Sequence, residues 1–239
     1  MKTEPADHTI QFGTRQILYH LHRTDRKSLR IVVSPELTVD IFAPKTASYE
    51  EIRSVVKKKA AWIARTLDKM EVYHPLPAPK RYLSGETLVY LGRQYRLKVE
   101  EGKSQAAKLS GRFLFVRVEG REDAKSVKKK TEAWYRKRAH ETLSRYVEKC
   151  YTIASRHNVR KALLVIRAMR RRWGSCSPSG RITLNLNLVQ APVHCIEYVI
   201  MHELCHLKHH NHSKAFYSLL TRCLPDWFKR KETLDRIRL

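Results

Sequence analysis

The chain has 239 residues, of which 42% are hydrophobic and 9% aromatic, so it can bury a sizeable core and is not intrinsically disordered. Its longest apolar stretches, such as 162–166, are far too short to cross a bilayer, which excludes a membrane-spanning protein. A formal net charge of +25 makes nucleic acid a candidate partner, the alternative being a basic surface that only aids solubility.

The cysteines indicate a reducing compartment. There are five, an odd number in no framework spacing, and the polar start MKTEPADHTIQ has no secretory leader. We therefore expect free thiols and a cytoplasmic location.

A β-hairpin and an amphipathic helix are predicted first. Apolar residues alternate over 29–33 and 37–41 around the turn SPE, which indicates a hairpin with one buried face. The period changes after Pro44, and Ser48 with Glu51 has the spacing of a helix capping box. The apolar stripe of this helix consists of Ile52, Val55, Val56, Ile63 and Leu67.

Two further regions are predicted before residue 160. The proline-rich segment 74–81 should be an extended connector, and short strands with turns at Gly92 and Gly111 should follow it. Residues 122–157 should form a long helix. We expect two domains: a β-rich N-terminal region with one helix over 1–120, and a second domain over 121–239.

The last third of the chain contains two strand-like runs and an apolar helix. ALLVIR (162–167) and ITLNLNLV (182–189) are joined by AMRRRWGSCSPSGR, and the second run alternates apolar with polar side chains. Pro192 then begins a helix through VHCIEYVIMHELCHLKHH.

This helix contains a metal-binding pattern. His202 and His206 are four residues apart, so their side chains project from the same helix face and can converge on one ion. Glu203 is rotated by roughly 100° about the axis, which does not suit a third ligand but lets it reach a water molecule on the ion as a base.

A catalytic zinc usually has three protein ligands and one open position. His209 would lie about 10 Å along a straight helix from His202, and His210 points to another face. His212 follows Asn211, which can end the helix in a left-handed conformation and return the chain to the metal. We therefore predict His212 as the third ligand, at the metzincin spacing, although His209 stands where that pattern has glycine.

Two other interpretations were weighed. A solvated histidine-rich helix would not need the apolar residues Val199, Ile200 and Leu204 around the motif. Cys176 could be a nucleophile, but no base stands beside it in the sequence. Cys205 faces away from the ion and is expected to be a core thiol.

Residues 170–217 closely resemble the YgjP-like metallopeptidase family, a relative of the SprT-like and WLM zinc peptidases. The resemblance extends more weakly upstream through RKSLRIVVSPELTVDIFAP and KKKAAWI. It implies an α+β fold with a zincin-type active-site helix on a small sheet, a zinc ion on His202, His206 and His212, and Glu203 as catalytic base. In zincins the strand before the helix lies along the substrate cleft, so ITLNLNLV is expected to pair with an extended peptide.

The predicted function is zinc-dependent hydrolysis of peptide bonds, with a peptide or protein as substrate and nucleic acid as a candidate partner. Tyr217 and residues 170–172 are weak candidates for the oxyanion stabiliser. One alternative is a metal-dependent hydrolase of nucleotides or other phosphorylated compounds. Another is a basic nucleic-acid-binding module with a structural metal site. Three histidines beside a glutamate leave an open metal position, which favours hydrolysis over a structural site.

Overall fold

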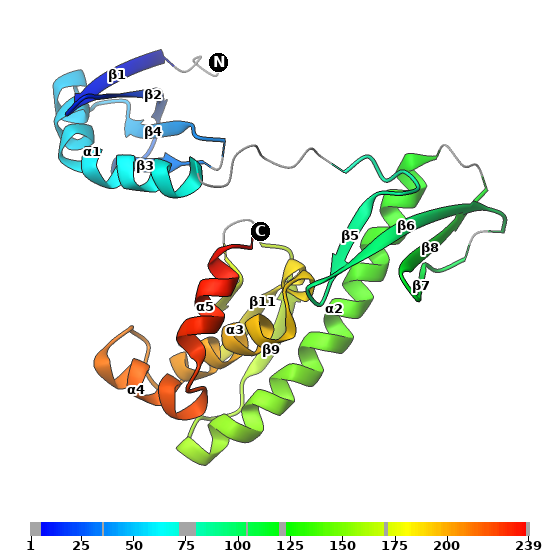
Figure 1. Cartoon of the computed structure of the whole chain (residues 1–239). Helices are drawn as coiled ribbons and strands as arrows, with labels where there is room; N and C mark the ends of the chain where they lie inside the picture. Colours follow the sequence, from blue (N-terminus) through cyan, green and yellow to red (C-terminus); the bar gives the residue numbers. More distant parts are fainter. Residues whose placement is uncertain are drawn as a thin grey trace. The chain divides into compact units, whose positions relative to one another are not determined.

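The chain forms two compact units, Met1–Pro79 and Lys80–Leu239, each with its own hydrophobic core (Figure 1). The computed structural model describes residues 6–34, 36–71, 80–103, 105–119, 123–169 and 172–237. The predicted α+β class is confirmed. Residues 72–79, with the prolines of the predicted connector, lie outside the described residues, as do Arg170 and Arg171.

The first unit is a four-stranded sheet covered by one helix. Its strands are β1 (Ala6–Phe12), β2 (Arg15–Thr24), β3 (Arg30–Val33) and β4 (Val39–Pro44), in the order β1-β2-β4-β3. β3 and β4 pair antiparallel, as the predicted hairpin requires, whereas the β1–β2 hairpin was not predicted. Helix α1 (Tyr49–Glu71) contributes Ile52, Val56 and Ile63 to the core.

Helix α1 begins with the predicted capping box. The Ser48 backbone N–H donates to Glu51 Oε2 at 2.8 Å, and the Glu51 N–H donates to Ser48 Oγ at 3.2 Å. Val55, predicted in the apolar stripe, is instead exposed, and Ala60 and Ala64 are buried. At 100° per residue Val55 lies about 115° from the centre of the buried stripe, so the core does not reach it.

The second unit begins with another four-stranded sheet. It consists of β5 (Thr87–Tyr90), β6 (Arg93–Glu101), β7 (Lys108–Ser110) and β8 (Phe113–Val118), in the order β5-β6-β8-β7. The predicted turns are present, with φ of +77° at Gly92 and +53° at Gly111.

This sheet shares a core with the long helix α2 (Ala124–Ala154), which runs along the unit (Figure 1). Leu97 and Leu114 from the sheet belong to the same buried cluster as Val127 and Leu143 from α2. The compact units therefore divide at residue 79, whereas we had expected the boundary at residue 120. Packing of this sheet against α2 is a long-range property that strand periodicity does not reveal.

A three-stranded sheet and three helices complete the unit. The strands are β9 (Leu163–Arg167), β10 (Gly174–Cys176) and β11 (Arg181–Asn185), in the order β10-β11-β9, preceded by the short 3-10 helix η1 (Ser155–His157). The helices are α3 (Val193–His206), α4 (Lys214–Cys223) and α5 (Trp227–Asp235). Within the described ranges, none of the helices has the length and apolar character needed to cross a bilayer.

The predicted strand ITLNLNLV is only partly correct. It ends at Asn185, and residues Leu186–Gln190 form the 3-10 helix η2. The Asn185 side chain accepts a hydrogen bond from the Asn187 N–H at 3.1 Å, which caps η2 and ends the strand.

We expect Ser48→Ala to destabilise the first unit by about 1 kcal/mol, because it removes the cap of α1. Hydrogen exchange of α1 amides and urea unfolding of the full chain would measure this. Ser54→Ala is the matched control, since Ser54 is exposed in the middle of the same helix and alanine is the better helix former there. Equal effects of the two substitutions would contradict the capping role.

Candidate metal centre

Three histidine rings converge at the end of α3. The Nε2 atoms of His202 and His206 are 3.2 Å apart, those of His206 and His212 are 3.2 Å apart, and those of His212 and His202 are 3.0 Å apart. A tetrahedral ion with bonds of 2.0–2.1 Å would require nitrogens about 3.3–3.4 Å apart. Small ring adjustments satisfy that geometry, so the three side chains could hold one metal ion.

The loop after α3 carries His212 back to the helix. Helix α3 ends at His206, and the His209 N–H donates to the Cys205 carbonyl at 3.0 Å. Asn211 is not among the described residues with positive φ, so the predicted left-handed termination at Asn211 is wrong. Helix α3 has its C-cap at Leu207, about three residues before the C-cap that this mechanism would require.

His209 contributes its backbone to the centre. His206 Nδ1 donates a hydrogen bond to the His209 carbonyl at 3.0 Å. This places the proton on Nδ1 and leaves the Nε2 lone pair directed at the other two rings.

Burial keeps two of the three histidine rings uncharged. Burial, followed by the neighbouring His206 and His212, lowers the pKa of His202 to about 3, and burial also lowers the pKa of His206. Both rings are therefore neutral at pH 7 and available to a cation. His202 Nδ1 is buried without a hydrogen-bond partner among the described residues, so packing alone orients that ring.

Phe216 supplies that packing. Its fully buried ring lies 5.0 Å from the ring of His202, 4.5 Å from that of His206 and 5.0 Å from that of His212, measured between centroids. Ser213 Oγ accepts a hydrogen bond from the Phe216 N–H at 3.4 Å and caps α4. This cap fixes where the helix that carries Phe216 begins. The sequence analysis gave Phe216 no role; its position four residues after His212 was the available signal.

Glu203 lies beside β10 rather than among the histidines. Its carboxyl is buried, which raises its pKa to about 7 against the opposing effect of Arg172. Gly174 is in close approach to it: a Cβ at that position would lie 2.8 Å from both Cγ and Oε1 of Glu203. Glycine therefore allows the β10 backbone to contact the Glu203 side chain, a role that the sequence did not reveal.

Asn185 holds the backbone of Met169 and Arg172, ahead of β10. Its buried Nδ2 donates to the carbonyls of Met169 at 2.7 Å and Arg172 at 2.8 Å, and its Oδ1 accepts from the N–H groups of Met169 and Asn187. The Asn185 N–H also donates to the Trp173 carbonyl at 2.8 Å. The amide is thus fully hydrogen-bonded, and it fixes the position of the residues before Gly174.

The strand order corrects one expectation about substrate. ITLNLNLV was expected to pair with an extended peptide, but β11 is the central strand, antiparallel to β10 and parallel to β9. Its backbone is therefore occupied on both sides. β10, next to Glu203, is an edge strand of this sheet.

The remaining candidates do not belong to the group of three histidines. Cys205 is a buried thiol whose pKa is raised by its contact with the Cys223 thiol and by burial. Burial also raises the pKa of Cys176, which does not suit a nucleophile. Tyr217 stacks on the His212 ring at a centroid distance of 6.1 Å.

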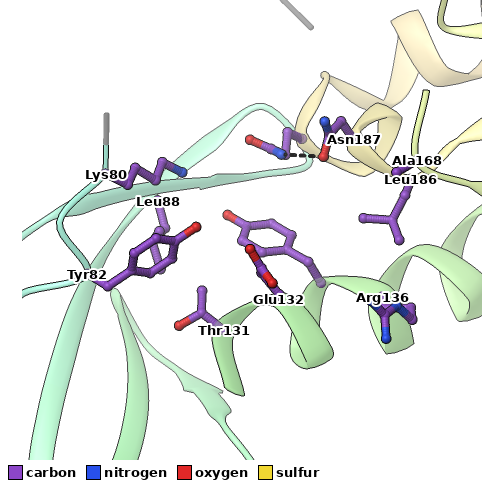
Figure 2. A pocket seen from close by; sticks show the side chains of 11 residues that line it. Lys80, Tyr82, Leu88, Thr131, Glu132, Arg136, Ala168, Leu186 and Asn187 are labelled. Atoms are coloured by element: carbon purple, nitrogen blue, oxygen red, sulfur yellow. Dashed lines mark hydrogen bonds between the residues drawn. The ribbon is translucent and has the colours of Figure 1, made fainter. Parts of the chain in front are cut away.

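A pocket of about 310 Å³ lies elsewhere in the second unit. Lys80, Tyr82, Glu132 and Asn187 are among the residues that surround it (Figure 2). Buried Thr131 also lines it, with a hydroxyl that lacks a partner in the described part of the chain. None of the three histidines, nor Glu203, lines this pocket, so it does not give access to the metal centre.

Comparison with known proteins places this geometry in a family. A family model described as "YgjP-like, metallopeptidase domain" matches residues 27–237. The solved structure of the metallopeptidase zymogen of Pyrococcus abyssi abylysin is similar at 25% sequence identity over 40% of this chain and 90% of that chain, with a TM-score of 0.35. No match was found among curated proteins.

We expect purified protein to carry about one metal ion per chain, and His202→Ala, His206→Ala or His212→Ala to lose most of it, because two imidazoles hold an ion much more weakly than three. Elemental analysis after dialysis would measure this. His209→Ala is the matched control, since it keeps the backbone carbonyl that orients His206. Retention in the His212 variant together with loss in the His209 variant would refute the ligand set.

Proposed function

The chain belongs to the YgjP-like metallopeptidase family, and from this we propose a zinc-dependent peptidase with His202, His206 and His212 as metal ligands and Glu203 as general base. The observation that carries the proposal is the convergence of three Nε2 atoms at α3, the helix that also carries the buried carboxyl of Glu203. At the level of the family the protein is a metal-dependent peptidase. The identity of the ion and the role of each residue are our inference.

The donor set favours zinc. Three neutral imidazoles without a thiolate are typical of catalytic zinc sites, and three protein ligands leave the fourth position open. A zinc ion held there would polarise the scissile carbonyl and make water more acidic. A structural site would instead be closed by four protein ligands.

Glu203 is suited to carry a proton. A pKa near 7 lets a carboxylate accept a proton from water and return it to the leaving amine at neutral pH. Its exclusion from bulk water strengthens its interactions with the reacting groups. Gly174 and Asn185 act as positioning residues. Gly174 leaves room for the Glu203 carboxylate, and Asn185 holds the backbone ahead of Gly174 through the Arg172 carbonyl.

The edge of β10 is the proposed docking line for substrate. An extended peptide can pair with the unoccupied side of an edge strand, and Glu203 lies against this strand at Gly174. A bound backbone would then pass close to the carboxylate. This arrangement selects flexible or unfolded segments, because a folded chain has no free strand to offer.

Hydrolysis of nucleotides is the competing reaction for the same donor set, and the family match favours peptides over it.

Association with nucleic acid is a separate proposal, supported by one face of α1. Lys58, Trp62, Arg65 and Lys69 lie within about 60° of one another, opposite the buried stripe. Trp62 is 44% exposed, and the three cations form no ion pair with any described residue. An aromatic ring between cations is the usual platform for single-stranded nucleic acid.

We predict that the protein binds a thymidine oligonucleotide without sequence preference, and that the affinity falls steeply with salt. Trp62→Ala should weaken binding about 5- to 150-fold, which corresponds to the loss of one stacked base. Fluorescence anisotropy at several salt concentrations would measure both effects.

The matched charge control compares Lys58→Glu/Arg65→Glu in α1 with Lys125→Glu/Lys129→Glu in α2, a pair of exposed lysines one helical turn apart. Only the first pair should abolish binding. Equal losses from both pairs would mean that net charge alone attracts the oligonucleotide, and salt-insensitive binding would remove nucleic acid as a partner.

Glu203→Gln should retain zinc and melting temperature while hydrolysis falls by at least roughly 10² to 10⁴, because the amide can hydrogen-bond water but cannot take its proton. Gly174→Ala should also keep zinc but lower kcat, because the added Cβ displaces the carboxylate. Ser175→Ala, on the same strand, is the control. Cleavage of an unfolded protein mixture and phosphate release from nucleotides would be measured in parallel. Full activity of the Glu203 variant on the hydrolysed substrate would disprove the mechanism.

A further inference from the structure

A series of aromatic rings leads from the metal centre onto α5. Tyr217 stacks on His212 with ring centroids 6.1 Å apart and planes inclined by 28°. Trp227 stacks on Tyr217 at 5.4 Å and 26°. Phe228 stands against Trp227 at 5.8 Å with an interplanar angle of 82°. The Tyr217 and Trp227 rings are thus close to parallel, and the Phe228 ring is nearly perpendicular to that of Trp227.

This aromatic series is presented to solvent. Tyr217 is 40% exposed and Phe228 is 58% exposed, the latter among the largest exposures of an apolar side chain in the described residues. Trp227 is half-buried, and its Nε1 donates to Thr221 Oγ1 at 2.9 Å, which fixes the orientation of its ring. Contiguous exposed apolar side chains are typical of a binding surface, whereas single exposed apolar residues are common and need no explanation.

The charges around the series favour an apolar partner. Arg230 is paired with Glu197 at 2.7 Å and with Asp226 at 2.9 Å, and Lys231 is paired with Asp235 at 2.5 Å. Arg230 and Lys231 are therefore ion-paired within the fold, in contrast to the cations beside Trp62. An uncharged side chain bound here would not have to displace those counter-charges.

We infer that Tyr217, Trp227 and Phe228 receive a large apolar or aromatic side chain of the peptide substrate and so determine cleavage specificity. The inference rests on the proposed peptidase function and on the continuity of the series with His212. The rings of His212 and Tyr217 are 6.1 Å apart and those of Tyr217 and Trp227 5.4 Å. The step from Trp227 to Phe228 adds 5.8 Å, and an extended chain advances about 3.3–3.6 Å per residue, so the recognised side chain lies within about five residues of the scissile bond.

The ring geometry explains which side chains fit best. Aromatic pairs prefer offset-stacked or edge-to-face arrangements, and the change of plane between Trp227 and Phe228 offers both to one guest ring. Such contacts contribute about 0.5–1.5 kcal/mol beyond the area they bury. The preference for an aromatic over a small residue should therefore depend measurably on Phe228.

The test uses zinc-loaded full-length protein. Mass spectrometry of a digested, denatured protein mixture should show enrichment of aromatic and large aliphatic residues at one position within about five residues of the cleaved bond. Two peptides built on the strongest site, with Phe or Ala at that position, then give a ratio of kcat/KM. Phe228→Ser should lower this ratio about 2- to 13-fold, the equivalent of one aromatic contact, and Phe228→Tyr should preserve it.

Phe113→Ser is the matched control, because Phe113 is 42% exposed but lies in β8 of another sheet. It should leave the ratio unchanged. An unchanged ratio in Phe228→Ser, or no enriched position near the cleaved bond, would overturn the inference. So would a shift from dimer to monomer in Phe228→Ser, since the aromatic series would then be an interface between two copies of the chain.

Binding separates this inference from the proposed function. Nuclear magnetic resonance titration of the Glu203→Gln protein with nine-residue Gly/Ser peptides carrying one central Phe or Ala measures the preference without turnover. A preference for Phe that disappears in the Phe228→Ser background, without cleavage by the wild type, would refute the peptidase and retain the surface. Equal binding of the two peptides would refute the surface, whatever the wild type cleaves.

Discussion

Three imidazole Nε2 atoms approach one another to within 3.2 Å, and the three-histidine site depends on this constraint. Protonated rings at such distances would repel, and the burial that keeps His202 and His206 neutral requires an apolar support. Phe216 is that support, because one ring contacts all three histidines. The cap of α4 at Ser213 is therefore part of the metal centre, although it offers no ligand.

The small sheet determines what lies against the Glu203 side chain. The Asn185 side chain stands at the end of β11 and caps η2. The same amide also binds the Met169 and Arg172 carbonyls ahead of β10, so one side chain holds three backbone segments together. This arrangement brings Gly174 to the Glu203 side chain. The Glu203 carboxylate is consequently positioned by a strand from one side and by its own helix from the other, which keeps a buried carboxylate in one orientation.

Local patterns were readable from the sequence, and contacts between distant segments were not. The four-residue spacing of His202 and His206 predicted neighbouring rings because helix geometry is regular, and the cap at Ser48 followed from a three-residue spacing. Gly174 and Phe216 were missed because their roles depend on packing between separate elements. ITLNLNLV alternated as a strand should, yet the side chain of Asn185 ended it early. The unit boundary was misplaced because the burial of β5–β8 against α2 leaves no mark in the periodicity of either.

The shortness of β10 has a kinetic consequence. Three residues can form only a few backbone hydrogen bonds with a docked chain, so residence on this edge would be brief and a client would have to present an already extended segment. For a folded client, the rate of cutting would then follow the fraction of time that its segment spends locally open. The rate of cleavage would thereby depend on the local stability of the substrate, and proteins that unfold locally most often would be cleaved fastest.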